Sequence, residues 1–173
     1  PTPQPSSEAH VARFVALYSQ IRTVTSYDVL QDESTGQYRA YQWLLNDDLF
    51  HLSGNESNFI QRYTLASFYF ATNGDAWKEC GRAFSLSSPQ QGGNFCGEDM
   101  DTWRFLSAVE ECQWFGITCA ITAGKVVDIV LTDNNLQGTI PPEISNLSFL
   151  NTLVLSENSM NGTISTSSPR LRT

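Results

Sequence analysis

A repeated segment in the last third of the chain limits the possible folds more than any other feature of the sequence. Residues 126–140 return 24 residues later as residues 150–164. The same residue stands at five aligned positions of the two copies: Leu131/Leu155, Asn134/Asn158, Gly138/Gly162, Thr139/Thr163 and Ile140/Ile164. Three further pairs are apolar in both copies: Val126/Leu150, Ile129/Leu153 and Leu136/Met160. Copies of this length predict coils that stack, because one coil cannot bury its own apolar face.

The repeated positions have separate structural roles. The apolar residues alternate over 126–131, which indicates a short strand with one buried face. Asn134 and Asn158 follow the strands, where a buried amide can bond free backbone groups of its own coil and the next. Gly138 and Gly162 permit a backbone conformation that other residues resist. After Ile164 the pattern ends, so we expect either a fragment or a last coil that another surface covers.

Both copies resemble the 24-residue plant-type leucine-rich repeat, which has the pattern L-x-x-L-x-L-x-x-N-x-L-x-G-x-I-P. Residues 112–119, Cys-Gln-Trp-Phe-Gly-Ile-Thr-Cys, are similar to the C-x-W-x-G-(V/I)-x-C motif of the cap in such proteins. Residues 72–77, Thr-Asn-Gly-Asp-Ala-Trp, are similar to the T-N-G-(D/S)-x-W motif before that cap. Residues 38–48 are similar to the front end of leucine-rich-repeat proteins of diatoms. The resemblance implies a cap over the open apolar end of the first coil.

The chain has four cysteines, Cys80, Cys96, Cys112 and Cys119, which allow three disulfide pairings. An even number in an acidic, lysine-poor chain favours disulfides and an oxidising compartment, and free cysteines in a reducing compartment are the alternative. The resemblance implies a disulfide between Cys112 and Cys119 and, with it, one between Cys80 and Cys96. We therefore expect the protein to be secreted or to lie in an oxidising organelle lumen. The usual zinc-ligand spacings are missing, so we predict neither a metal site nor a cofactor.

Three Asn-x-Ser/Thr sequences make Asn55, Asn146 and Asn161 glycosylation candidates in such a compartment. Asn146 is the best placed of the three, because the return segment of such a coil faces outward.

Upstream of the repeats, apolar residues at helical spacing predict helices that begin near Ser7, Gln37 and Glu56. The third, residues 56–71, is apolar nearly all round, which is typical of a buried helix. We expect an α+β fold with a helical N-terminal region, a disulfide-bonded cap and a short leucine-rich-repeat solenoid of about two 24-residue repeats. The expected boundaries are an extended leader at 1–6, helices at 7–74, the cap at 75–125, repeats at 126–165 and an irregular tail at 166–173.

Charge and motif content argue against several classes of function. Ten basic residues against 18 acidic ones give a net charge of −8, which disfavours nucleic-acid binding. No apolar run approaches the ~20 residues that a membrane-spanning helix needs. His10 and His51 are paired with no nucleophile, and the neighbours Asp47–Asp48 and Glu110–Glu111 would point apart on a helix or strand. We predict no catalytic residues and no enzymatic activity.

The function that fits best is a protein-binding module. Strand residues between the buried positions would lie on a shared concave face. The residues expected to contact a partner there are Asp128, Val130, Thr132, Asp133, Asn151, Thr152, Val154, Ser156 and Glu157. Asp133 and Glu157 would stack in one column and favour a cationic or hydrogen-bonding partner. The alternative is a structural or accessory subunit of a larger complex, including a membrane-associated one, docked through its helical half and the open end of the repeats.

Overall fold

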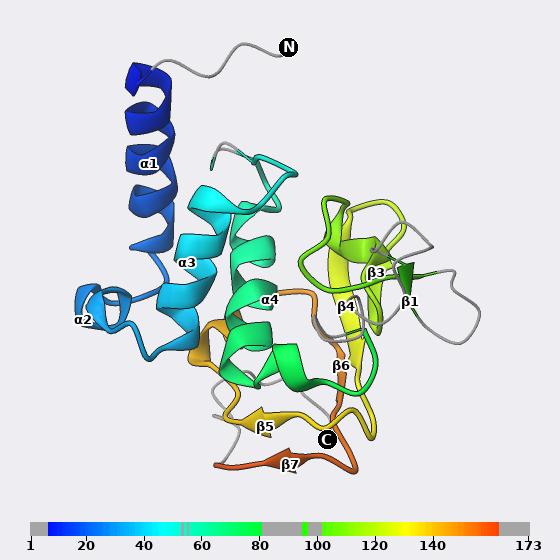
Figure 1. Ribbon diagram of the computed structural model, residues 1–173. Helices are drawn as coiled ribbons and strands as arrows, with labels where there is room; N and C mark the ends of the chain where they lie inside the picture. The colour runs from blue at the N-terminus through cyan, green and yellow to red at the C-terminus, as the bar shows by residue number, and fades with distance from the viewer. Residues whose placement is uncertain (1–6, 53, 55, 81–94, 97–101, 163–173) are drawn as a thin grey trace.

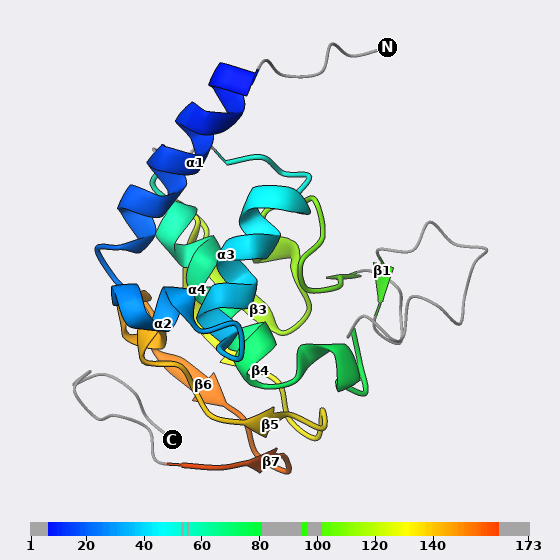
Figure 2. The same ribbon diagram turned by 60° about the vertical axis from the view of Figure 1, so that its left-hand side comes forward.

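The structure, a computed structural model, describes residues 7–52, 54, 56–80, 95–96 and 102–162. Helices form one side of the molecule and short strands the other, and the helix α4 (Phe59–Ala71) runs between them (Figure 1). The view in Figure 2 shows α1 (Ser7–Ile21) standing away from the strands. The described part of the chain holds no helix that is long and apolar enough to cross a membrane. The protein is therefore an α+β structure.

The helices expected from the spacing of apolar residues are present. They are α1, α3 (Gly36–Asn46) and α4, which begins at Phe59 rather than at Glu56. A further helix, α2 (Tyr27–Gln31), was not expected, because five residues are too few to show a helical period. Thr35 starts α3 by accepting a hydrogen bond from the Tyr38 N–H at 3.0 Å, as an N-cap side chain does.

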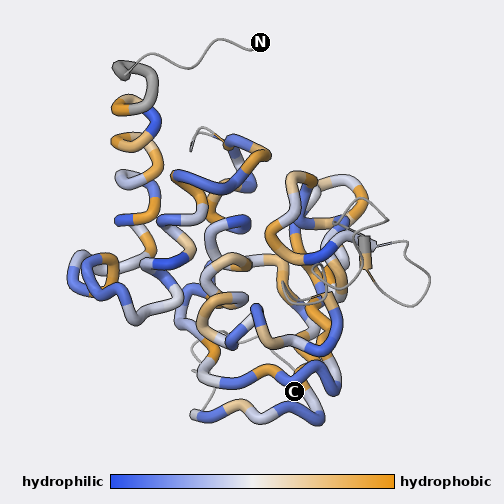
Figure 3. Tube along the Cα trace, in the orientation of Figure 1, coloured by the Kyte–Doolittle hydropathy of each residue, from blue (hydrophilic) through white to orange (hydrophobic). Residues whose placement is uncertain are grey.

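The helix α4 is buried on nearly all sides, as its composition predicted. Ten of its residues are buried, among them Phe59, Tyr63, Leu65 and Phe68. It packs against α3 on one side and against the repeats on the other. Apolar segments run along this helix and along the strands opposite it (Figure 3). The core therefore lies between the helices and the strands, with α4 at its centre.

Within the described residues, the strands form three small sheets. The largest has the order β3-β4-β6, in which β3 (Ile117–Ala120) is antiparallel to β4 (Lys125–Val130) and β6 (Thr152–Val154) is parallel to β4. The short strands β5 (Gln137–Gly138) and β7 (Ser159–Met160) pair in parallel, and β1 (Phe95–Cys96) pairs with β2 (Thr102–Trp103). In the β4–β6 ladder Ile129 lies opposite Leu153 and Val130 opposite Val154. Residues that pair between the two strands are therefore 24 residues apart in the sequence, which is the period of the repeat.

The helix α4 crosses the end of the first repeat copy. The Gln61 side chain donates to the Gly124 carbonyl at 3.1 Å and accepts from the Val126 N–H at 2.9 Å, which ties α4 to the start of β4. At the other end of α4, the Gln137 N–H donates to the Thr72 carbonyl at 3.1 Å. The open end of this copy is thus covered by α4, which precedes the segment 75–125 that the sequence assigned to the cap.

A buried carboxylate joins the return segment of the first copy to the helices. Glu143 lies in the 3₁₀ helix η4 (Pro142–Asn146) and is only 3% exposed. Its two oxygens accept hydrogen bonds from the Thr25 hydroxyl at 2.6 Å and from the Gln37 amide at 2.8 Å. The Tyr63 hydroxyl lies 2.9 Å from the same Thr25 oxygen. Because these groups come from four segments, the network fixes the helices against the repeat.

Two disulfides brace the part of the chain between the helices and the repeats. Cys112 is bonded to Cys119 with 5.5 Å between the Cα atoms, and Cys80 to Cys96 with 5.3 Å. These are the two pairs that the resemblance implied. Cys112 lies in the 3₁₀ helix η3 (Glu111–Gln113) and Cys80 follows the 3₁₀ helix η1 (Gly74–Ala76). The expected leader, 1–6, and the expected tail, 166–173, lie outside the described residues.

Candidate binding face

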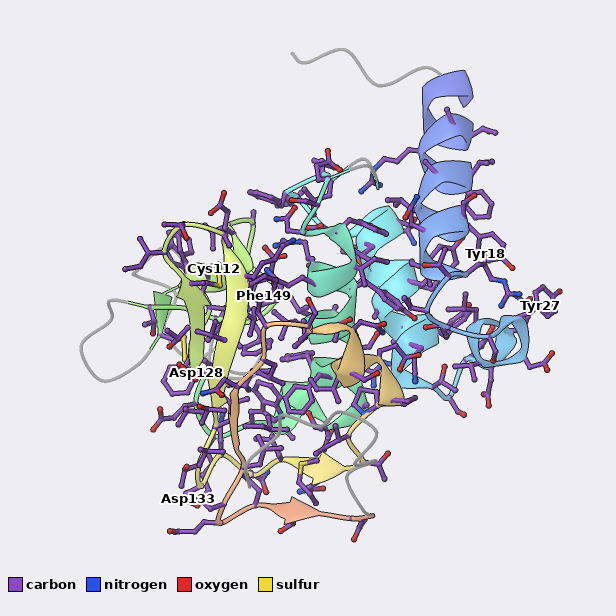
Figure 4. The ribbon with its side chains drawn as sticks, turned by 180° about the vertical axis from the view of Figure 1, so that it is seen from behind. Tyr18, Tyr27, Cys112, Asp128, Asp133 and Phe149 are labelled. Carbon is purple, nitrogen blue, oxygen red and sulfur yellow. A yellow bond between two sulfur atoms is a disulfide. The ribbon has the colours of Figure 1, made fainter. Side chains whose placement is uncertain are left out.

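The outward side of the sheet β3-β4-β6 carries most of the residues that the sequence predicted as a binding face. Ile129 and Leu153 point into the core, so their neighbours along each strand point away from it. Asp128 lies opposite Thr118 on one side and Thr152 on the other. We call this surface the strand face, and its residues are Thr118, Asp128, Val130, Thr132, Thr152, Val154 and Ser156. Figure 4 shows Asp128 and Asp133 on the side of the strands turned away from the helices.

The centre of the strand face is apolar. Val130 is 45% exposed and lies directly opposite the half-buried Val154. The Val130 N–H donates to the Gly116 carbonyl at 2.8 Å, so the segment before β3 borders the same row. Any side chain at Gly116 would collide with the Val130 carbonyl and with Leu131. Because residue 116 is a glycine, the segment before β3 can lie close to β4, and the strand face extends beyond the two strands of the repeats.

Hydroxyl groups border this apolar centre at one end. The Thr132 and Ser156 oxygens lie 3.3 Å apart, at positions that differ by one repeat period. At the other end of the centre, Asp128 and Thr152 form a polar row with Thr118 of β3. The strand face thus combines a small apolar patch with hydrogen-bonding groups on two sides, as the centres and rims of protein interfaces do.

Asp133 and Glu157 were expected to form an acidic column, but a lysine pairs with one of them. Both residues have positive φ, 46° and 59°, so the same turn follows both strands. Lys78 pairs with Asp133, and both side chains are more than half exposed. The lysine offsets the charge of Asp133, so the column does not present two free carboxylates. Sequence reasoning missed Lys78, because it lies 55 residues before its partner.

The asparagine that follows β6 holds the two copies together. Asn158 Oδ1 accepts hydrogen bonds from the N–H groups of Asn134 at 3.0 Å and Leu136 at 2.9 Å. Its Nδ2 donates to the Leu131 carbonyl at 2.7 Å. These bonds satisfy backbone groups of the turn after β4, which the sheet leaves unpaired. The ladder expected between the copies is present, and it keeps the rows of the strand face in register.

A buried arginine ties α4 to the loop after α3 and to the segment 107–111. Arg62 of α4 is fully buried and donates from Nε and Nη2 to the Asp48 carboxylate at 2.9 and 2.7 Å. Its remaining donors reach the carbonyls of Val109 at 2.8 Å and Ser107 at 2.9 Å. Glu111 Oε2 lies 3.7 Å from Nη1. One member of each pair of adjacent carboxylates in the sequence, Asp48 and Glu111, thus lies beside this guanidinium.

The surroundings of Arg62 make Glu111 unusual. Burial raises the pKa of Glu111, while the nearby guanidinium acts in the opposite direction. The second carboxylate oxygen, Oε1, is buried and has no hydrogen-bond partner. The ring centroids of Trp43, Phe50 and Trp114 lie 4.8–5.2 Å from the guanidinium carbon. In the described part of the chain, no three His, Cys, Asp or Glu side chains gather as metal ligands would.

The remaining predicted site residues lie apart from the strand face. Asn146 is exposed in η4, and its amide donates to the Glu143 carbonyl at 3.0 Å. Asn161 is exposed after β7, and Asn55 lies outside the described residues. His51 is exposed in the loop after α3, with φ of 55°. Asn151 is exposed just before β6, where its N–H donates to the Val127 carbonyl at 2.8 Å.

Known proteins resemble part of this chain. It is 43% identical over 58 residues to Receptor-like kinase TMK4 of Arabidopsis thaliana, a stretch that covers 34% of this chain and 6% of the relative. It is 42% identical over 67 residues to LRR receptor-like serine/threonine-protein kinase EFR of the same plant, 39% of this chain and 6% of the relative. Against Probable inactive leucine-rich repeat receptor kinase XIAO of Oryza sativa subsp. japonica, the identity is 39% over 60 residues, 35% and 5% of the two chains.

No family model matches the chain. Each similar stretch spans less than a tenth of the relative's own length, so most of each relative has no counterpart in this comparison. These relatives are plant proteins, and the similarity of residues 38–48 to diatom proteins stays a prediction. What the similar stretches show is a plant-type leucine-rich-repeat region in about a third of this chain.

Proposed function

We propose that this chain is a non-catalytic, protein-binding leucine-rich-repeat module and that its partner contacts the strand face. Residues 126–162 would form coils of a solenoid, with α4 and the disulfide-bonded segment as its cap. The β4–β6 register carries the proposal, because it stacks exposed positions of the two copies in rows. The similarity to leucine-rich-repeat receptor kinases favours this function over the structural-subunit alternative.

The proposed compartment is extracellular or an oxidising organelle lumen. Both cysteine pairs form disulfides, and disulfides persist where thiols are not kept reduced. The relatives named as receptor kinases are consistent with such a location. In that setting Asn146 and Asn161 are exposed acceptors for a glycan.

The chemistry of the strand face suggests how a partner would bind. Val130 and Val154 offer an apolar centre, with hydroxyls of Thr132 and Ser156 on one side and Asp128 on the other. A partner with an apolar side chain flanked by a basic one would match this pattern. β3 adds a third strand, which brings the face nearer to the ~800 Å² per partner of a standard interface.

The test is a selection of displayed random peptides on the full chain, followed by binding to matched variants. We expect the enriched peptides to lose at least about tenfold in affinity on Val130→Arg and on Val154→Arg, since both place a charge on the apolar centre. Ser145→Arg puts the same charge on the exposed return segment and should leave their affinity unchanged. Peptides that bind both valine variants as tightly as the unchanged protein would contradict the proposal.

A further inference from the structure

A concave surface lies on the helical side of the molecule. It is a groove of about 460 Å³ between α3, the end of α4 and the loop 104–108. This volume lies within the range of pockets that take a small molecule or an inserted side chain. None of the residues that line the groove belongs to β3, β4 or β6. Whatever binds here would therefore leave the strand face open.

One part of the groove is apolar and partly exposed to solvent. Leu49 lines the groove, and 72% of its surface is exposed to solvent. Phe70 and Leu106 are half-buried beside it. Beneath them the rings of Tyr69 and Phe105 stack with centroids 6.0 Å apart and planes 18° from parallel. An apolar side chain that entered the groove would cover Leu49 and pack against the stacked rings of Tyr69 and Phe105.

The loop that forms one wall has a strained backbone. Leu106 has φ of 62°, a left-handed conformation that a bulky side chain rarely adopts. Such strain persists only where the surrounding structure enforces it, and it concentrates at ligand-binding segments. The hydroxyl of Ser107 bonds back to the Arg104 carbonyl, and the Ser107 carbonyl accepts from the buried Arg62. The loop is thus held in this shape from below, with Leu106 facing the groove.

The other part of the groove presents a guanidinium group. The Arg39 side chain lies over the Phe70 ring, with the guanidinium carbon 4.6 Å from the centroid. Asp75 lies 3.4 Å from one nitrogen of Arg39, and both side chains are more than 40% exposed. The other Asp75 oxygen accepts from the Tyr69 hydroxyl at 2.9 Å. An exposed pair of this kind holds its partners weakly, so Arg39 can bind a further carboxylate with its remaining donors.

We propose that this groove binds a segment of a partner protein that inserts one large apolar side chain between Leu49, Phe70 and Leu106 and places a carboxylate on Arg39. The stacking on Phe70 fixes the plane of the guanidinium and so the direction from which the carboxylate arrives. Asp47 and Arg104 also line the groove, so its wall carries one further charge of each sign besides the pair of Arg39 and Asp75. With these charges balanced, the ligand is a peptide with one acidic residue next to a large apolar one. This site does not depend on the function proposed for the strand face.

The experiment uses two matched probes, N-acetyl-Phe-Asp-amide and N-acetyl-Phe-Asn-amide, titrated into the full chain with isotope-labelled leucine methyl groups. We expect the methyl signals of Leu49 and Leu106 to shift, with a Kd on the order of 1 mM for the Asp probe. The Asn probe should bind about threefold to tenfold more weakly, because it lacks the charge that Arg39 recognises. Arg39→Gln should remove the difference between the probes, and Leu49→Asp should weaken both of them.

Three controls separate binding in the groove from other effects of the substitutions. Val154→Arg changes only the strand face and should leave both titrations as they are. Circular dichroism verifies that each variant folds, and Leu49→Ala examines the same contact if Leu49→Asp does not fold. Unchanged signals of Leu49 and Leu106 at about ten times the expected Kd would overturn the site. A preference for the Asp probe that survives Arg39→Gln would overturn the role of the guanidinium.

Discussion

Asn134 and Glu79 are joined by two hydrogen bonds between the amide of one and the backbone of the other. Asn134 Oδ1 accepts from the Glu79 N–H at 2.6 Å, and Asn134 Nδ2 donates to the Glu79 carbonyl at 3.3 Å. Asn158, one repeat period later, bonds in the same direction to the turn of the first copy. The segment before Cys80 therefore takes the place that a preceding coil would occupy, and the asparagine ladder runs on into the disulfide-bonded segment.

The ladder predicts similar losses of stability at its two asparagines. Asn134→Ala and Asn158→Ala each leave buried backbone groups without a partner, so each should lower the free energy of unfolding by about 1–3 kcal/mol. Urea denaturation followed by tryptophan fluorescence measures the change. Asn161→Ala, at an exposed position of the second copy, is the control and should stay within about 0.5 kcal/mol. Equal values for all three variants would exclude the ladder as a stabilising element.

The equivalent glycines of the two copies predict unequal losses. Gly138 and Gly162 have nearly the same φ, 96° and 88°, so alanine costs both positions the same backbone strain, about 1 kcal/mol. At Gly138 a Cβ atom would overlap the Ala71 carbonyl of α4, whereas the nearest atom at Gly162 is 3.5 Å away. Gly138→Ala should therefore destabilise the protein by at least about 1 kcal/mol more than Gly162→Ala.

Thermal unfolding of the two glycine variants, side by side, measures this difference. It isolates the packing of α4 on the first copy, because the turn itself is shared. Gly124→Ala serves as a reference for strain alone, since φ is 58° there and no atom lies within 4 Å of the added carbon. If Gly138→Ala were no worse than Gly124→Ala, α4 would not cover the first copy as described.

The sequence predicted best what depends on regular spacing. The repeat period anticipated the β4–β6 register, and the apolar composition of residues 56–71 anticipated a buried α4. It did not reveal contacts between irregular segments. Asp48 and Glu111 lie in or next to loops, so no period relates either of them to Arg62. The groove beside Arg39 was missed for the same reason, because its walls come from three separate segments of the sequence whose approach depends on tertiary packing.

Arg62 predicts a large loss of stability when its charge is removed. Arg62→Met leaves the buried carboxylates of Asp48 and Glu111 without their cation, which should lower the free energy of unfolding by about 3–5 kcal/mol. Arg39→Gln breaks an ion pair that is more than 40% exposed and should change it by at most about 1 kcal/mol. Urea denaturation compares the two. A loss at Arg62 no larger than that at Arg39 would contradict the anchoring role of the buried cluster.

Glu111 predicts a dependence of stability on pH. Burial raises its pKa in the folded protein above the ordinary value of 4.5, so the folded state binds this proton more tightly than the unfolded chain. The resulting stabilisation is complete below the unfolded-state pKa and is lost as the pH rises through the folded-state pKa. Relative to Glu111→Gln, which carries no charge at any pH, the unchanged protein should therefore lose stability as the pH increases from about 4.5.

The control for this pH dependence is the neighbouring residue. Glu110→Gln removes the exposed carboxylate that contributes least to the raised pKa of Glu111 and keeps the buried one, so the stability of this variant should still fall as the pH rises. The free energy of unfolding of all three proteins, measured by urea denaturation from about pH 4.5 to pH 8, separates the two sites. Arg62 and Asp48 are unchanged in all three proteins, so a pH dependence that disappears only in Glu111→Gln belongs to the buried carboxylate. Parallel profiles for Glu111→Gln and the unchanged protein would mean that Glu111 keeps its ordinary pKa despite its burial.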